Sequence, residues 1–188
     1  MALIHYPVIN KNGDTIASAI TNLDLHDIAR LAKTFGLPAF YVVTPLKDQQ
    51  ELAGKIVSHW TGGLGATLNP KRREALELIW IKDSLEEVLA HIQEQTNRVP
   101  KTVVTSARKI KGRISFSMFR DMLKDGNPYV LILGTGWGLS EHLIAGADYV
   151  LEPVGGAANY NHLSVRSAAA IIMDRLIGDF KTENASCS

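Results

Sequence analysis

The sequence predicts an α/β fold with a mostly parallel sheet that helices cover on both faces. Short apolar runs, most of them rich in β-branched residues, alternate with helical patterns along the chain. Strands buried on both faces have this character, and their alternation with helices is typical of a parallel sheet. The chain has 188 residues, 46% of them hydrophobic, which suits one domain with a sizeable core. The predicted strands are Ala2–Val8, Ala39–Val43, Leu78–Ile81, Thr102–Thr105, Tyr129–Leu133 and Tyr149–Leu151.

The predicted helices carry recognisable start and stop signals. Asn22 or Asp24 can cap a helix whose apolar stripe runs from Leu25 to Phe35, and Gly36 would end that helix. Three further helices are predicted: one that begins at Asn69-Pro70 and runs through Leu76, one that begins with the Ser84 and Glu87 capping box, and one from about Leu163 to Ile177.

We expect one domain over residues 1–180 and a flexible polar tail over residues 181–188. The only cysteine, Cys187, falls in this tail, so a disulfide framework and a cysteine-based metal site are excluded. A reducing cytoplasm is therefore the expected location. We expect no targeting segment, and no apolar run approaches the about 20 residues that span a membrane. The histidines show no metal-ligand spacing, so no metal is expected.

Basic residues gather between positions 101 and 124, although the whole chain has a net charge of only +1. Such a segment permits a phosphate-facing patch on a nearly neutral protein, and a solvated loop is the simpler alternative. The segment contains seven basic residues and one acidic residue, Asp121, and its basic members are Lys101, Arg108, Lys109, Lys111, Arg113, Arg120 and Lys124.

Unusual loops follow three of the predicted strands. The strand that ends at Thr105 continues into Ser106-Ala107-Arg108, and the strand that ends at Leu133 continues into the glycine-rich segment 134–139. The strand that ends at Leu151 continues into a long loop with a Gly-Gly pair and an Asn-Tyr-Asn-His cluster. Glycine after a buried strand lets the backbone approach a ligand, and ligands of parallel sheets bind at strand carboxyl ends. The sequence therefore predicts a small-ligand site over residues 130–166.

A dinucleotide site is one interpretation of these loops, because Glu152 ends the strand that follows Gly134-Thr135-Gly136. Two features disfavour it. Gly138 comes one residue too early for the G-x-G-x-x-G pattern. The helix from Ser140 to about Ala145 is also too short for a phosphate-binding crossover helix, which normally runs about 10 residues or more. A nicotinamide-dependent oxidoreductase is thus a distant alternative.

Three blocks, in order and together spanning nearly the whole chain, carry a family resemblance. The first runs from Thr21-Asn22 through residues 27–30 to Phe35-Gly36, the second from Val130 to Ser140, and the third from Pro153 to the segment Leu163–Ile171. The sequence resembles the SPOUT, or α/β-knot, methyltransferases, which use S-adenosylmethionine chiefly to methylate RNA. It is most similar to a subfamily of short bacterial proteins that sometimes occur fused to the tRNA (guanine-N1) methyltransferase.

The resemblance implies a deep trefoil knot in the C-terminal part of the chain. It also implies that the knot binds S-adenosylmethionine in a bent shape, mainly through backbone groups. A homodimer through the knot helices would complete each site from the partner subunit, and the small face of Ala168, Ala169 and Ile172 would suit close packing. The residues implied around the donor are Thr105, Leu133, Gly134, Thr135, Gly136, Gly138, Leu139, Glu152, Pro153, Val154, His162, Leu163 and Val165.

The sequence departs from the family pattern in two blocks. The related ribose 2′-O-methyltransferases have a glutamate in the second block and one more residue before its closing glycine, where this chain has Gly136 and Trp137. In the third block, Ser164 and Arg166 replace the asparagine and serine of the family. Donor binding rests on backbone groups and is still expected. Ribose 2′-O methylation does not follow.

Three residues are candidates for catalysis. Arg30 matches an arginine that activates or orients the acceptor in part of the family, and a surface ion pair with Asp27 is its simpler role. Asn22 can either cap the helix or contact substrate. His162 can accept a proton near neutral pH, although loop histidines more often hydrogen-bond backbone groups.

The predicted RNA contacts are four basic residues of the loop beside the first donor loop, together with one arginine on the first predicted helix and one on the last. They are Arg30, Arg108, Lys109, Lys111, Arg113 and Arg166. Arg166 is expected to bind either a phosphate or the carboxylate of the methyl donor. Trp137 can stack on a base or pack in the core.

Together these features predict an S-adenosylmethionine-dependent methyltransferase that acts on RNA, either tRNA or rRNA. The alternative is a non-catalytic protein of the same fold that binds S-adenosylmethionine or RNA without transferring a methyl group.

Overall fold

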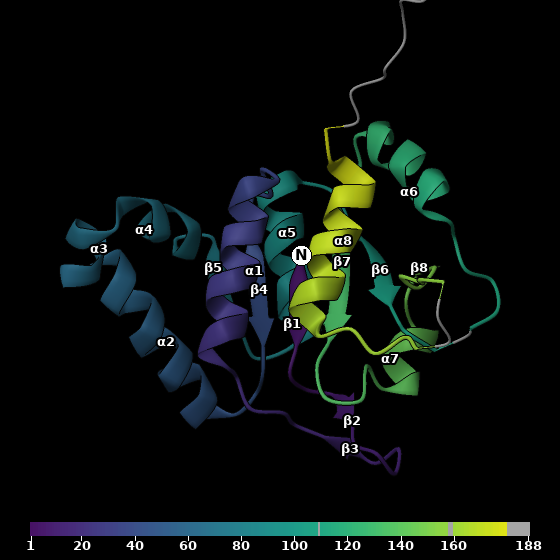
Figure 1. Ribbon diagram of the computed structural model, residues 1–188, viewed down its shortest axis with the longest axis horizontal. Helices are drawn as coiled ribbons and strands as arrows, with labels where there is room; N and C mark the ends of the chain where they lie inside the picture. The colour runs from purple at the N-terminus through teal and green to yellow at the C-terminus, as the bar shows by residue number, and fades with distance from the viewer. Residues whose placement is uncertain (109, 158–159, 180–188) are drawn as a thin grey trace, which may run out of the picture.

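The computed structural model describes residues 1–108, 110–157 and 160–179. Its centre is a sheet of six strands in the order β5–β4–β1–β7–β6–β8, and every neighbouring pair is parallel (Figure 1). The predicted parallel sheet is therefore confirmed. Its strands are β1 (Ala2–Ile4), β4 (Phe40–Val43), β5 (Ile79–Lys82), β6 (Lys101–Thr105), β7 (Tyr129–Gly134) and β8 (Tyr149–Leu151).

Helices cover both faces of this sheet. In Figure 1, α1 (Asn22–Thr34) and α8 (Val165–Ile177) lie in front of the strands, and α5 (Leu85–Thr96) lies behind them. Alternate strand residues face the two apolar layers, since Leu3 belongs to one buried cluster and Ile4 to the other. The remaining helices are α2 (Lys47–Thr61), α3 (Leu64–Leu68), α4 (Pro70–Leu76), α6 (Phe116–Met122), α7 (Glu141–Ala145) and a 3-10 turn, Leu123–Asp125.

The prediction of one strand from Ala2 to Val8 is wrong. The parallel strand β1 ends at Ile4, and the chain then forms a separate hairpin of β2 (Val8–Ile9) and β3 (Thr15–Ile16). Pro7 is the physical reason, because proline has no N–H group and cannot donate to the ladder of a central strand. The last ladder contact on the β4 side is the bond from His5 N to Val43 O, 2.9 Å.

The N-cap of helix α1 lies one residue before the first predicted cap. Thr21 is the N-cap: its Oγ1 accepts from Asp24 N (3.1 Å) and donates to Asp24 Oδ2 (2.7 Å). Asn22 and Asp24 are thus the first and third residues of the helix, and neither caps it. Thr21 takes this role because its backbone is extended while its hydroxyl reaches the first turn. Gly36, with φ +67°, follows the end of the helix as predicted.

Other predicted helix starts are confirmed. Asn69 accepts from Arg72 N at 3.0 Å, and Ser84 accepts from Glu87 N at 3.4 Å. The short helix α7 begins after Ser140, which accepts from Leu143 N at 3.3 Å. Helix α8 is capped by Ser164 and begins at Val165, two residues later than predicted.

Helix α8 uses its small-residue face within the chain. Ala169 is fully buried and Ile172 is 3% exposed, because α8 packs against α1, α6 and the sheet. Ala169 and Ile172 are therefore already packed within one chain and are not available to a partner subunit, and a homodimer through the knot helices stays a prediction. The exposed face of α8 carries Ser167, Ala170 and Asp174 instead.

The fold leaves three expectations as predictions. Threading of the chain into a trefoil knot and a single domain over residues 1–180 stay predictions. The predicted tail and Cys187 lie outside the described residues. Within the described part of the chain, no helix has the length and apolar character needed to cross a membrane.

Candidate functional site

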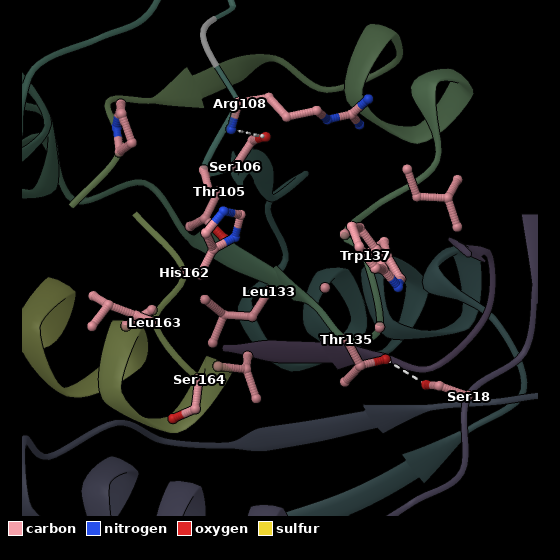
Figure 2. A pocket seen from close by; sticks show the side chains of 18 of the residues that line it. Ser18, Thr105, Ser106, Arg108, Leu133, Thr135, Trp137, His162, Leu163 and Ser164 are labelled. Carbon is pink, nitrogen blue, oxygen red and sulfur yellow. Dashed lines mark hydrogen bonds between the residues drawn. The ribbon is translucent and has the colours of Figure 1, made fainter. Parts of the chain in front are cut away.

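A cavity of about 810 Å³ lies at the carboxyl ends of β6, β7 and β8 (Figure 2). The loops that follow these strands, 105–108, 133–138 and 152–154, form one side of it, together with residues 161–166 before and within α8. Residues 9–13 of the hairpin and residues 18–24 form another side. The structure therefore brings together three loops that are separate in the sequence, where the strand-end argument predicts a ligand site.

The predicted donor residues line this cavity with one exception. Leu139 is 1% exposed and belongs to the core, where it forms a β-bridge with Val8. The residues of the predicted set that line the cavity are Thr105, Leu133, Gly134, Thr135, Gly136, Gly138, Glu152, Pro153, Val154, His162, Leu163 and Val165.

The glycines of the second loop are required by its geometry. A Cβ atom on Gly134 would lie 2.8 Å from the backbone nitrogen of Leu139, which is too close for any side chain. Gly136 and Gly138 have φ angles of +59° and +110°, in the region that favours glycine. The loop therefore folds back tightly and keeps its backbone open to the cavity.

The β2–β3 hairpin holds this loop from the other side. Trp137 N donates to Ile9 O at 3.1 Å, and Ile9 N donates to Gly138 O at 3.0 Å. The side chain of Asn10 closes the hairpin turn, because its Oδ1 accepts from Asn12 N (2.8 Å) and from Asp14 N (3.0 Å). The sequence analysis did not predict this hairpin, although the Asn-Lys-Asn-Gly-Asp segment between two short β-branched runs is a hairpin signal.

A chain of hydrogen bonds connects the core to the cavity. His5 Nδ1 lies 3.0 Å from Ser18 Oγ, Ser18 Oγ is hydrogen-bonded to Thr135 Oγ1, and Thr135 Oγ1 donates to Ile4 O at 2.9 Å. Figure 2 shows the hydroxyls of Ser18 and Thr135 turned toward one another. His5 is fully buried, and burial lowers the pKa of its imidazole below the usual value, against the opposing effect of Asp24.

An ion-pair cluster lies beside this chain. Arg166 Nη1 is 2.5 Å from Asp24 Oδ1, and Arg166 Nε is 3.3 Å from Asp27 Oδ2. Asp24 is 5% exposed, so this pair is largely shielded from solvent. The guanidinium of Arg166 lines the cavity with two carboxylates already beside it, and its predicted contact with phosphate or the donor carboxylate stays a prediction.

The catalytic candidates are not gathered in one place. Arg30 and Asn22 are exposed on α1, and among the described residues neither lines the cavity. Asp27 pairs with Arg166, and within the described residues it forms no ion pair with Arg30. His162 does line the cavity, and its ring makes an edge contact with Tyr160, with ring centroids 5.2 Å apart.

Aromatic and apolar side chains are exposed around the cavity. Trp137 is 65% exposed, so its interpretation as a core residue is wrong. Leu163 is 46% exposed and Tyr160 73% exposed. Asn161 ties the third loop to the first, since its Nδ2 donates to Ala107 O at 3.3 Å.

The predicted basic loop adjoins the cavity. Arg108 Nη2 donates to Leu139 O at 3.1 Å, and Arg108 Nη1 lies 3.6 Å from Glu141 Oε1. Lys111 and Arg113 are exposed and line a second hollow that shares Glu152 with the cavity. Lys109 lies outside the described residues. Among the residues that are described, no group of His, Cys, Asp and Glu could hold a metal ion.

Known proteins resemble this chain over nearly its whole length. The family of SAM-dependent RNA methyltransferases matches residues 1–178. A tRNA (guanine-N(1)-)-methyltransferase of Nitratidesulfovibrio vulgaris is 47% identical over 95% of this chain and 41% of its own length. An uncharacterized protein of Aquifex aeolicus is 37% identical over 94% of this chain and 86% of its own length. The chain thus spans about two fifths of the length of the curated tRNA methyltransferases that it matches.

The fold is also found among solved structures. The TrmH/SpoU tRNA modifying enzyme of Aquifex aeolicus superposes with a TM-score of 0.52 over 94% of this chain and 72% of its own, at 16% identity. That similarity supports the fold alone, whereas the family match covers nearly the whole chain and confirms the resemblance seen in the sequence. The chain belongs to the family of SAM-dependent RNA methyltransferases.

Proposed function

We propose that the cavity binds S-adenosylmethionine between the loops that follow β6, β7 and β8. The observation that carries this proposal is the convergence of the three loops on one cavity, with glycines that leave the second loop's backbone open. A volume of about 810 Å³ suits a small-molecule cofactor. Backbone groups near Thr105, Gly136 and Val154 would supply most polar contacts, and Leu133 and Leu163 would cover the apolar parts of the donor.

Calorimetry tests donor binding. S-adenosylmethionine should bind with one site per chain, and NAD should give no heat of binding. The absence of S-adenosylmethionine binding would contradict the proposal, and binding of NAD alone would favour the oxidoreductase alternative.

The proposed substrate is tRNA, with rRNA as the other candidate. Exposed Arg108, Lys111 and Arg113 lie beside the cavity in a strongly basic segment, as expected for phosphate contacts. Curated relatives are named tRNA methyltransferases, but more than half of their length lies outside the match, so the nucleotide they modify does not transfer to this chain. Work on tRNA would take place in the cytoplasm.

The proposed chemistry is methyl transfer aided mainly by alignment of donor and acceptor. Arg30 would orient the acceptor, Asn22 would contact it, and His162 would accept a proton at the cavity. Because Arg30 and Asn22 lie outside the cavity of one chain, we place the reaction in a homodimer in which α1 of the partner completes the site. The same separation favours the second candidate function, a non-catalytic protein that binds S-adenosylmethionine or RNA.

A tritiated methyl-transfer assay on unmodified tRNA and rRNA separates the two candidate functions, and sedimentation establishes the oligomeric state. Catalysis predicts incorporation that is lost in Arg30→Ala while donor binding is retained. Donor binding without incorporation into either RNA would support the non-catalytic function. Unchanged activity in Arg30→Ala would remove Arg30 from the catalytic residues.

A further inference from the structure

The hydrogen-bond chain of His5, Ser18 and Thr135 joins three segments that are far apart in the sequence. His5 follows β1, Ser18 lies in the connection before α1, and Thr135 follows β7. Ser18 and Thr135 line the cavity, whereas His5 is fully buried behind them. Of the described residues, none is hydrogen-bonded to His5 Nε2.

The donors and acceptors of this chain determine its direction. Ile4 O can only accept, so the Thr135 hydroxyl donates its hydrogen there, and Thr135 Oγ1 must accept from Ser18. Ser18 then has no hydrogen left for His5, so the ring must donate from Nδ1 to Ser18 Oγ. The carbonyl of His5 is a weaker alternative acceptor for Ser18, at 3.5 Å. Because burial keeps His5 neutral near pH 7, its one ring hydrogen lies on Nδ1.

The hydroxyl hydrogens of Ser18 and Thr135 are therefore both donated to acceptors within the protein. Ser18 and Thr135 each retain a lone pair for the cavity, and neither can donate to a ligand there. Asp24, which also lines the cavity, is a carboxylate and likewise only accepts. Asp24 Oδ1 is paired with Arg166, and Asp27, the second carboxylate partner of Arg166, does not line the cavity among the described residues.

We infer that Ser18, Thr135 and Asp24 form a wall, here called the hydroxyl wall, that recognises the N–H edge of the base to be methylated. The inference rests on the proposed function and adds the chemical class of the acceptor to it. A wall that only accepts hydrogen bonds matches an amino or imino N–H group and repels a phosphate or a carboxylate. His5 is a positioning residue, because it acts on the ligand only through Ser18.

Two ligands could bring an N–H group to this wall: the acceptor base and the amino group of S-adenosylmethionine. The base is favoured because Ser18 and Asp24, two of the three wall residues, lie outside the three loops proposed to hold the donor, whereas Thr135 belongs to the loop after β7. The two sources are separable, since one changes the affinity for RNA and the other the affinity for S-adenosylmethionine.

The direction of the hydrogen bonds from His5 to Thr135 can be tested without a methyl-transfer assay. Nitrogen-15 NMR of the imidazole groups in the full chain should show neutral His5 with its hydrogen on Nδ1, and Ser18→Ala should shift that resonance. If neutral His5 carried its hydrogen on Nε2, Nδ1 would accept from Ser18 and the direction of the hydrogen bonds would be reversed. The wall could then no longer be said only to accept hydrogen bonds, and the inference would be overturned.

Recognition of the base is tested by kinetics on a pool of unmodified tRNA transcripts. Ser18→Ala should raise the KM for RNA about tenfold, the loss expected for one hydrogen bond to a desolvated group, with kcat nearly unchanged. Calorimetry should show S-adenosylmethionine affinity within about twofold of the native value, because the wall is assigned to the base. Ser58→Ala, an exposed serine on α2, is the matched control and should change neither constant.

The role of His5 is tested by a pair of variants, with folding checked by circular dichroism. His5→Leu removes the donor to Ser18 and should raise the KM for RNA as Ser18→Ala does. His5→Gln keeps an N–H donor and should restore most of the affinity. A loss of S-adenosylmethionine affinity with unchanged KM for RNA would overturn the assignment to the base, as would a product methylated on ribose oxygen.

A native protein that binds S-adenosylmethionine but methylates no RNA would refute the proposed methyl transfer and, with it, the assignment of the wall to a base that is methylated. In that case NMR would still decide whether the wall only accepts hydrogen bonds. The failure of the proposed function and the failure of the wall are therefore distinguishable.

Discussion

The two sides of the cavity are built by different means. The side formed by the strand-end loops depends on backbone shape. Gly134 has no room for a Cβ atom, and Gly136 and Gly138 have positive φ angles that favour glycine. The side formed by the N-terminal residues depends on side chains, with Ser18 and Asp24 tied to partners more than a hundred residues away. A backbone-lined side suits a cofactor that is the same in every reaction, whereas a side-chain-lined side can change with the substrate.

The largest loss of stability is expected from a substitution on the N-terminal side. Asp24→Asn leaves Arg166 without its closest carboxylate and should lower the free energy of unfolding by about 2–3 kcal/mol, less than for a fully buried pair because Arg166 is partly exposed. Urea denaturation measures the change. The double variant Asp24→Asn, Arg166→Met should recover part of it, and Glu51→Gln, in an exposed pair with Lys55, should cost under about 0.5 kcal/mol.

A slightly smaller loss is expected from a substitution in the loop after β7. In Gly134→Ala, the new Cβ would collide with the backbone of Leu139 and displace the loop. Overpacking of about 1–2 kcal/mol should weaken S-adenosylmethionine binding about tenfold or more in calorimetry. Gly155→Ala is the control in a neighbouring loop, because a Cβ there meets no atom within 4 Å and should leave the affinity unchanged. Equal losses in both variants would argue against a backbone-defined donor site.

The stability of the N-terminal side should depend on pH through His5. Burial lowers the pKa of His5 in the folded protein, so the unfolded chain takes up a proton first as the pH falls below 6.5. Stability should therefore be complete above pH 6.5 and decline below it, by no more than about 1.4 kcal/mol per pH unit from this group. His5→Gln should flatten that decline in thermal unfolding between about pH 5 and 7, a window that spans the usual histidine pKa. Ser58→Ala, on the surface of α2, is the control and should leave the decline unchanged.

A smaller change is expected at Lys111, a residue of the basic loop that lines the second hollow and not the cavity. Lys111→Ala should weaken RNA binding modestly and lower the slope of log affinity against log salt by about 0.7–0.9, as for one lost phosphate contact. Filter binding at several salt concentrations measures this slope. Lys55→Ala, on the far helix α2, should leave it unchanged, and a slope that Lys111→Ala does not alter would remove this residue from the RNA contacts.

The loop side could be predicted from the sequence because each of its signals is local. An apolar strand followed by glycines identifies a strand-end loop, and the order of three such loops predicts that they meet. The same logic predicted the parallel sheet, the caps at Asn69 and Ser84, and the stop at Gly36. The chain's resemblance to a known family then specified the kind of ligand.

The N-terminal side could not be predicted, because its signals are tertiary. Nothing near Ser18 indicates that its hydroxyl meets Thr135, and nothing near Asp24 indicates a partner in α8. The expected contact of Arg30 with Asp27 rested on helical spacing alone, and a residue from α8 pairs with Asp27 instead. The merged strand Ala2–Val8 shows the same limit, since Pro7 was passed over in an otherwise apolar run.

The β2–β3 hairpin also has a consequence for how the protein is made. Its contacts with Trp137 and Gly138 join residues at the start of the chain to residues synthesised about 130 positions later. The hairpin cannot make these contacts until the loop after β7 has been synthesised, and contacts of such long sequence separation form slowly. The ligand-binding part of this molecule should be among the last to acquire its native structure during synthesis, together with the pairing of β1 and β7.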